Sequence, residues 1–517
     1  MKRNNQHKPL PPLEMIELHI LHYWKMRKTD KQIVELLNTK HIDTSRYGIG
    51  LTRFRELRES MGLFRARKQA HTPETIQPAM IRLRAQYPKA GQREVCSLLF
   101  HEENMNVPKS VITAYFAQYE PDLLRQRRAN RLKRKRFWSA GVNDIWTLDQ
   151  HDKWKYKFGL ALHSCLEPFV GRIQWLKIWW TNSNPRLILS YYLDTVEESG
   201  HMPLVSQSDP GVENFGIANG HTLLRHWHDP SLEGTLQHRW MNEKKNVIPE
   251  IGWSQLRRRW TPGFEDILDV GVNNGWYNPS NLLEALIFRW VFIPWLQKEL
   301  DLYRDRVNNT AKRADRNKVL PHGVPNHMYE APEDYGALDF KIRVNPTAIA
   351  EVRNLYAPPD HDVFELVPRD FAIIVGQIYQ QLGQPSVTRT NCWDLYMDIL
   401  TRFQHLDSLH GVPAERDEQW GYALTMARDD YKDDIELIPN LRPLHNGADV
   451  IGPDGTYYMG GVRNGLGLDS VQSSQLDAMI DRDEPLPVGL VDLEEADPLI
   501  TWFSEDEGSP DSDHDEW

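Results

Sequence analysis

Three acidic residues stand in local contexts from which their side chains could bind metal ions together. Asp149 ends the run IWTLD, Asp209 follows the strand-like run PLVSQSD, and Glu250 begins EIGWSQLRRRW, which has helical spacing. Carboxylates at two strand ends and on one helix can converge on a pair of hard cations, because such cations prefer oxygen ligands. A pair of this kind activates water or a 3′-hydroxyl for in-line attack on a phosphodiester. We therefore predict a site for two Mg²⁺ ions, with Mn²⁺ able to substitute, and no organic cofactor.

Glu213 and Asp152 are the nearest alternatives to Glu250 as the third acidic ligand. Glu250 is preferred because basic residues follow it on the same predicted helix, among them Arg257 and Arg258. One carboxylate would then face the metals while basic side chains face the DNA backbone. An isolated acidic residue is most often a solvated surface group, so the prediction depends on the three contexts together.

The segment around these acids has the pattern of an α/β domain over residues 139–335. Apolar, aromatic runs predict three strands in a meander, and a helix with Pro at its first turn and Gly200 as its stop signal follows. A short buried strand and a late helix complete the order. These elements are, in turn, IWTLDQHD, KFGLALHSCL, RIQWLKIWW, NPRLILSYYLDTVEESG, PLVSQSD and EIGWSQLRRRW.

Three motifs in this segment are similar to those of a known family. WTLDQHDKWK, SDPGVEN and NVIPEIGWSQLRRRW resemble, in order, the acidic motifs of the DDE transposase and retroviral-type integrase core family. The resemblance covers about residues 139–335 and implies a ribonuclease H-like fold with Asp149, Asp209 and Glu250 as catalytic and metal-binding residues. In the family's division of labour, Asp149 would contact both ions, Asp209 one and Glu250 the other.

The same resemblance implies a partner and an activity. It implies that the protein binds double-stranded DNA, cleaves and joins its strands, and acts as a homo-oligomer. The loop between Asp209 and Glu250 is longer than in the tightest integrase pattern, and no His/Cys zinc module precedes the core. We find no GxxxxGK[ST] phosphate loop, no GxSxG elbow and no HExxH motif in the sequence.

Two helical modules are predicted before the core, over residues 1–72 and 73–123. In the first, two helices, a glycine-containing break and the basic helix LTRFRELRESMGL have the pattern of a helix-turn-helix. Arg53, Arg55 and Arg58 would then contact DNA. The alternative is a three-helix bundle whose basic face is simply solvated.

A basic linker is predicted over residues 124–138. The first 138 residues carry 28 Lys and Arg against 13 Asp and Glu, an electrostatic footprint typical of nucleic-acid binding. The linker would lie against phosphates or act as a nuclear import signal, unless it is a solvated helix. Its candidate DNA-binding residues are Arg131, Lys133, Arg134, Lys135 and Arg136.

Two regions are predicted after the core. Residues 336–440 have a mainly helical pattern and no motif that indicates a role. Residues 441–517 are acidic and rich in glycine and proline, so we expect disorder. The acidic tail is interpreted as a solubilising segment; a DNA mimic or a partner-binding tail is the alternative.

Composition bounds the cellular setting. No run approaches the roughly 20 apolar residues that cross a bilayer, and we find no secretory signal. The three cysteines are scattered, without a CxxC pair, which favours a reducing compartment. We predict an intracellular protein without a membrane partner, nuclear if its source is eukaryotic.

Aromatic residues near the acids have two interpretations. Trp146, Trp154, Trp253 and Trp260 could stack on splayed bases, but Trp146 and Trp253 are favoured as core residues. His151 and His163 could line the site, although a lone histidine near a strand is more often structural.

Two other functions stay open at this stage. The first is a domesticated DNA-binding or scaffolding protein with a weak or inactive site. The second is a nuclease of the same fold that acts on RNA–DNA hybrids, which the predicted helix-turn-helix modules disfavour.

Overall fold

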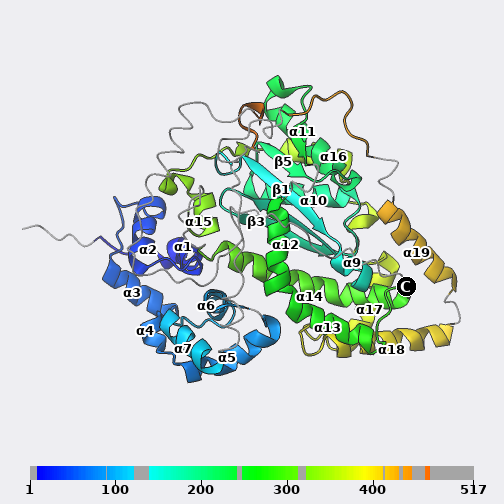
Figure 1. Ribbon diagram of the computed structural model, residues 1–517, viewed down its shortest axis with the longest axis horizontal. Coiled ribbons are helices and arrows are strands. Elements are labelled where there is room, and N and C mark those ends of the chain that lie inside the picture. Colours follow the sequence, from blue (N-terminus) through cyan, green and yellow to red (C-terminus); the bar gives the residue numbers. More distant parts are fainter. Residues whose placement is uncertain are drawn as a thin grey trace, which may run out of the picture.

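The computed structural model describes residues 8–88, 90–120, 139–241, 247–311, 322–410, 414–429, 435–444 and 460–465. A five-stranded sheet lies between the first helices of the chain and the last ones (Figure 1). The predicted α/β class is confirmed for this central region. No helix in the described segments is long and apolar enough to span a bilayer.

The sheet is mixed, and its central strand carries Asp149. Its order is β3-β2-β1-β5-β6, which is consistent with the ribonuclease H-like fold. The first three strands form an antiparallel meander, while β5 and β6 run parallel to β1. Their bounds are β1 (Ile145–His151), β2 (Ala161–Glu167), β3 (Arg172–Trp179), β5 (Val205–Ser208) and β6 (His238–Trp240).

Helices before and after β5 and β6 cover the sheet. Two of them, α10 and α11, pack on each other and on the sheet at β3, β5 and β6, while α12 packs on β1 and β2. Figure 1 shows α12 crossing in front of β1. The long elements of this region are α10 (Pro185–Ser199), α11 (Phe215–His228), α12 (Val247–Arg259), α13 (Thr261–Asn273) and α14 (Leu282–Asn308).

The ends of α10 follow from its sequence. The Asn184 side chain accepts a hydrogen bond from the backbone N–H of Arg186, and Pro185 occupies the first helical position. Gly200 ends the helix with a φ of 71°, a left-handed conformation that glycine adopts without strain. The short elements nearby are α9 (Lys153–Phe158), β4 (His201–Met202), η2 (Val212–Asn214), η3 (Pro230–Leu232), α15 (Pro325–Glu330), η4 (Pro332–Tyr335) and β7 (Ile342–Arg343).

Helix α14 covers the outer edge of the sheet. The Gln297 side chain accepts from Ile178 N–H and donates to Leu176 C=O, both at 3.0 Å. The Asn308 amide makes the same pair of bonds to Ile173, each 2.9 Å long. These amides satisfy the backbone groups that an edge strand such as β3 would otherwise leave unpaired. Pro294 lies inside α14, and the helix continues through it as one element.

The first helical module has its own small core. Ile16, Ile20, Ile33 and Phe54 are fully buried within it, and Thr29 caps α2 through a capping box with Gln32. The predicted helices are present, while their role as a helix-turn-helix stays a prediction. The module contains α1 (Leu13–Lys25), α2 (Asp30–Leu36), the π-helical turn η1 (Leu37–His41), α3 (Leu51–Ser60) and α4 (Ala66–Gln69).

Arg58 differs from the sequence-based expectation. Its side chain is only 4% exposed, its Nε lies 3.3 Å from Asp30 Oδ1, and its guanidinium lies 5.5 Å from the centre of the Trp24 ring. A buried guanidinium with these partners supports the module's core and cannot also face DNA. The prediction that Arg58 contacts DNA is therefore wrong. Arg53 and Arg55 are exposed on the same helix.

The second helical module shares a hydrophobic core with the sheet. Its helices are α5 (Pro73–Gln86), α6 (Gln92–His101) and α7 (Lys109–Tyr119), and their buried residues belong to the cluster that includes β1, β2 and β3. Glu94 of α6 joins two helices of the central region. Its Oε2 lies 3.4 Å from Arg259 Nε at the end of α12, and its Oε1 lies 3.3 Å from Arg306 Nη1 on α14.

Replacing Glu94 by alanine is expected to destabilise the protein by about 3 kcal/mol, because it leaves the buried Arg306 with Glu102 as its remaining carboxylate partner. The Arg306 side chain is 4% exposed, so water cannot replace the lost carboxylate. Urea unfolding would measure the loss. Glu103→Ala is the control, since its partner Arg82 is 61% exposed and such a pair contributes less than about 1 kcal/mol. Equal losses in the two variants would contradict the prediction.

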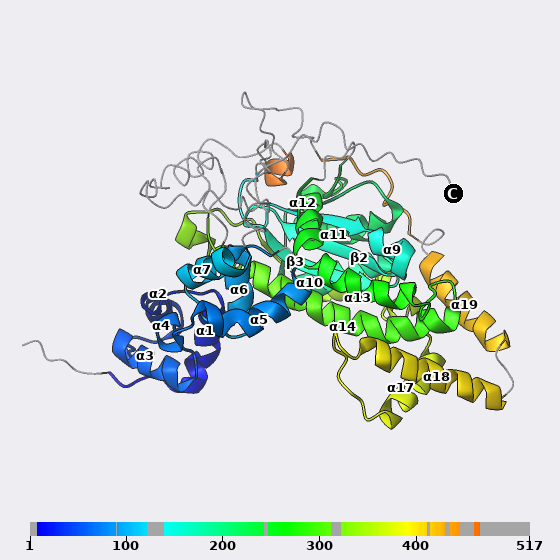
Figure 2. The same cartoon turned by 60° about the horizontal axis from the view of Figure 1, so that its bottom comes forward.

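The C-terminal helices pack on the central region. Trp393 of α18 donates a hydrogen bond from Nε1 to the Ile267 carbonyl of α13 at 2.8 Å, and its ring lies 4.7 Å from that of Phe292 on α14. The mainly helical pattern predicted for this region agrees with the helices α16, α17, α18 and α19. The elements are α16 (Pro346–Tyr356), η5 (Asp362–Phe364), α17 (Arg369–Gln381), α18 (Cys392–His410) and α19 (Ala414–Asp429). Figure 2 shows α17, α18 and α19 beside α14.

Two short pieces near the C-terminus also contact the sheet region. Leu236 N–H donates to the Arg442 carbonyl at 2.8 Å. Gly461 N–H donates to Oδ1 of the buried Asp144 at 2.7 Å, just before β1. Val462, in η7 (Val462–Gly465), is buried. The rest of the predicted acidic tail lies outside the described residues.

Candidate active site

Asp149 and Asp209 lie on two neighbouring inner strands, towards the same end of those strands. The parallel register pairs Thr147 of β1 with Gln207 of β5, so the two aspartates stand two residues further along neighbouring strands. Asp149 lies within β1, and Asp209 directly follows β5. The parallel pairing of β1 with β5 therefore places the two aspartates on neighbouring strands, with Asp149 inside its strand and not at its end.

Asp209 has an oxygen atom without a protein partner. Its Oδ1 is buried and receives no hydrogen bond from the described residues. The neighbouring side chains bind its backbone instead, since Ser208 Oγ and Asn214 Nδ2 both donate to the Asp209 carbonyl. Burial raises the pKa of the Asp209 carboxyl. A buried acceptor without a donor is costly, and a cation is one partner that would satisfy it.

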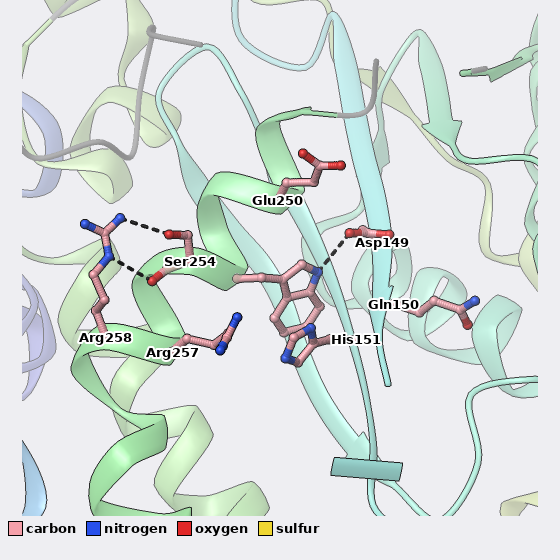
Figure 3. A pocket seen from close by; sticks show the side chains of 8 residues that line it. Asp149, Gln150, His151, Glu250, Ser254, Arg257 and Arg258 are labelled. Carbon is pink, nitrogen blue, oxygen red and sulfur yellow. Dashed lines mark hydrogen bonds between the residues drawn. The ribbon is translucent and has the colours of Figure 1, made fainter. Parts of the chain in front are cut away.

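Glu250 faces Asp149 from the first turn of α12. Figure 3 shows the two side chains on opposite elements, Asp149 on the strand and Glu250 on the helix. Both line a pocket of about 510 Å³. The pocket is also lined by Gln150, His151, Trp253, Ser254, Arg257 and Arg258. Four of the residues from α12 are spaced as 250, 253, 254 and 257, which places them on one face of a helix.

The electrostatics couple the three acids. The pKa of Asp149 is raised to about 7, first by burial, then by the negative charge of Asp209 and, to a smaller extent, by that of Glu250. Hydrogen bonds from Gln150 N–H and from Trp253 act in the opposite direction. Like charges raise a pKa only when they are near, so Asp209 and Glu250 both lie close enough to Asp149 to act on it.

The carboxylates are not arranged as a complete set of metal ligands within the described residues. Within the described part of the chain, no three His, Cys, Asp or Glu side chains are close enough to hold a metal ion together. Glu250 lies exposed in the first turn of α12. The donor set still fits a hard cation: oxygen ligands only, one of them buried and without a donor.

The alternative ligands are Glu213 and Asp152, and their carboxylates accept hydrogen bonds from other side chains. Glu213 Oε1 accepts from Gln150 Nε2 at 3.4 Å and from Asn214 Nδ2 at 3.0 Å. Asp152 Oδ1 accepts from Asn182 Nδ2 at 2.7 Å. Neither residue lines the pocket, and Asp209 does not line it either. The geometry favours Glu250 as the third acid because its side chain faces Asp149 across that pocket.

Residues 137–330 match a family model described as an integrase core domain. This segment belongs to the integrase core family. The match includes all three acids and the strands and helix that carry them. No curated protein and no solved structure matches the chain.

Trp253 connects two of the motifs of the integrase core. Its Nε1 donates to Asp149 Oδ2 at 3.0 Å, and its ring stacks on His151 with centroids 5.1 Å apart. The prediction that Trp253 is a core residue is incomplete, since the side chain is buried but also belongs to the site. Helical spacing from Glu250 was the signal that could have revealed this. Trp146 is fully buried, as predicted.

The two candidate histidines, His151 and His163, have different surroundings. His163 is buried and hydrogen-bonded to Trp175 Nε1, so it is structural. His151 lines the pocket, and its pKa is lowered to about 4 by burial first and then by Arg257 and Lys153. The ring is therefore neutral near pH 7 and presents an uncharged surface beside the acids.

Basic side chains border the pocket of the integrase core. Arg257 and Arg258 are exposed on α12, and Arg258 also bonds to Ser254 through its Nε and Nη2. Arg53 and Arg55 lie on α3, far along the chain from this pocket. The five predicted linker contacts, Arg131, Lys133, Arg134, Lys135 and Arg136, lie outside the described residues.

Proposed function

We propose that the protein binds double-stranded DNA and cleaves and transfers its strands in a metal-dependent reaction. The observation that carries this proposal is the electrostatic coupling of Asp149 to Asp209 and Glu250 within an integrase core, next to an open pocket. A pKa raised by burial and by neighbouring acids is typical of a functional carboxylate. Bound cations would remove this repulsion.

Asp149, Asp209 and Glu250 are the residues that would hold two Mg²⁺ ions, or Mn²⁺ in their place. Asp149 is the acid whose pKa both of the others raise, and it would contact both ions. When bound, such ions lower the pKa of the attacking water or 3′-hydroxyl and stabilise the leaving oxygen. The protein's part is to hold oxygen ligands at fixed positions on a strand, a strand end and a helix.

Arg257 and Arg258 would bind the DNA backbone beside the acids. Both side chains are exposed at the rim of the same pocket, where they would neutralise phosphates without reading sequence. Arg53 and Arg55 would provide a second contact through α3. We further propose that the protein acts as a homo-oligomer and works in the nucleus if its source is eukaryotic.

The test is Mg²⁺- and Mn²⁺-dependent nicking and strand transfer on duplex DNA that carries candidate terminal repeats, with the wild type compared with Asp149→Asn. Activity that disappears in the variant while DNA binding persists would support the proposal. Binding without activity in either protein would favour a domesticated scaffold. Equal activity in both would show that the active site lies elsewhere, and preference for RNA–DNA hybrids would indicate a different nuclease.

A further inference from the structure

We propose that Trp253 is a positioning residue that orients Asp149 for metal binding. This inference rests on the proposed function, because it concerns the same acidic site. The Trp253 indole N–H donates to Asp149 Oδ2 at 3.0 Å, and the side chain is 5% exposed. No other side-chain donor to the Asp149 carboxylate is found among the described residues.

Trp253 connects α12, on which it lies, to the central strand β1. It bonds to Asp149 and stacks on His151, with an angle of 18° between the ring planes. The two partners are two residues apart on β1, so their side chains point to the same face of the sheet. Trp253 lies three residues after Glu250, so the two side chains share one face of α12. The contacts of Trp253 therefore set where the first and third acids stand relative to each other.

The indole is chemically suited to this task. A carboxylate has two oxygens with about four lone-pair positions, and an indole N–H can donate but cannot accept. Trp253 thus fills one position on Oδ2, the Gln150 N–H fills another position on the carboxylate, and the remaining positions are left for cations. The indole adds no charge that would compete with them. Donors of this kind orient metal ligands, and their loss typically costs roughly 10–100-fold in metal affinity.

The experiment is a calorimetric titration of the full-length protein with MnCl₂ in the absence of DNA. Four proteins are compared: wild type, Trp253→Phe, Asp149→Asn and Trp175→Phe. We expect Mn²⁺ binding to be about 10–100-fold weaker in Trp253→Phe than in the wild type, and absent at the site in Asp149→Asn. Trp175→Phe should bind as the wild type does.

Trp175 is a matched control. Its Nε1 donates to His163 Nδ1 at 3.0 Å, and its ring stacks on His163 with an angle of 11° between the planes. Both substitutions therefore remove one indole hydrogen bond and shrink one tryptophan stacked on a histidine. Trp175 does not line the pocket. A loss of metal affinity through general loosening of the sheet would appear in both variants.

The outcomes separate the two proposals. Failure of the wild type to bind Mn²⁺ would contradict the proposed function. Wild-type affinity in Trp253→Phe, together with loss in Asp149→Asn, would overturn the role of Trp253 alone, and so would equal losses in Trp253→Phe and Trp175→Phe. Trp253→His keeps a ring N–H on a smaller side chain and should bind Mn²⁺ more tightly than Trp253→Phe; equal affinities in these two variants would also overturn the assignment.

Discussion

Glu250→Gln is expected to lower the rate of DNA cleavage by roughly a thousandfold, which corresponds to about 4 kcal/mol of transition-state stabilisation. The substitution keeps the size of the side chain and its place in the first turn of α12, but it removes the negative charge. A neutral amide is a much weaker ligand for Mg²⁺ than a carboxylate. Single-turnover cleavage of duplex DNA at saturating Mg²⁺ would measure the effect.

Glu213→Gln is the matched comparison for this experiment. Glu213 follows Asp209 closely in sequence but is bound by Gln150 and Asn214 and does not line the pocket. We expect the Glu213 variant to stay within about tenfold of the wild-type rate, since it removes no metal ligand. A large loss in Glu213→Gln together with a small loss in Glu250→Gln would show that the third metal ligand is Glu213, which follows β5, and not Glu250 on α12.

The second large effect concerns pH and metal together. Asp149 has a pKa of about 7 in the folded protein and must lose its proton to bind a cation. Affinity for Mg²⁺ should therefore be roughly tenfold lower at pH 6 than at pH 8. At a Mg²⁺ concentration of about one hundred times the dissociation constant at pH 8, stabilisation should be about 2.7 kcal/mol at pH 8 and about 1.4 kcal/mol at pH 6.

The metal-free protein should respond to pH in the opposite sense. A carboxyl whose pKa is raised on folding binds its proton more tightly in the folded state than in the unfolded chain. The stability that this provides is complete below about pH 4 and is lost as pH rises to about 7. Thermal unfolding in EDTA and in Mg²⁺, at pH 6 and pH 8, would measure both effects. Asp149→Asn should show neither, and equal metal-induced shifts at the two pH values in the wild type would contradict the argument.

Much of the sheet could be predicted because its strands are strongly apolar and its turns are marked. The elements that were not predicted depend on packing. Helix α11 contains Gly216 and Gly220, which resemble loop residues in sequence. A Cβ atom at Gly216 would lie 2.3 Å from the Pro185 carbonyl oxygen, and one at Gly220 would lie 2.7 Å from Leu189 Cδ1. These glycines allow α11 to approach α10, a requirement that exists only in the folded protein.

The site could be predicted only in part, because some of its contacts join residues that are far apart in the sequence. The sequence marks Asp149, Asp209 and Glu250 by local context, and parallel pairing of β1 with β5 does bring the first two together. The bond from Trp253 to Asp149 joins residues more than 100 positions apart, and no local pattern encodes it. The interpretation of Arg58 failed because an arginine on a basic helix has the same pattern whether it faces solvent or, as here, Asp30.

The shared hydrophobic cluster has a consequence for how this chain can be divided. Residues of α5, α6 and α7, of the sheet, and of α16, α17 and α18 belong to that one cluster, and Gly461 and Val462 reach back to the start of β1. A fragment cut at the limits of the integrase core, 137–330, would expose apolar surface at both of its new ends. The integrase core of this chain therefore needs its flanking helices to bury its apolar surface, so the unit that folds is larger than the matched segment.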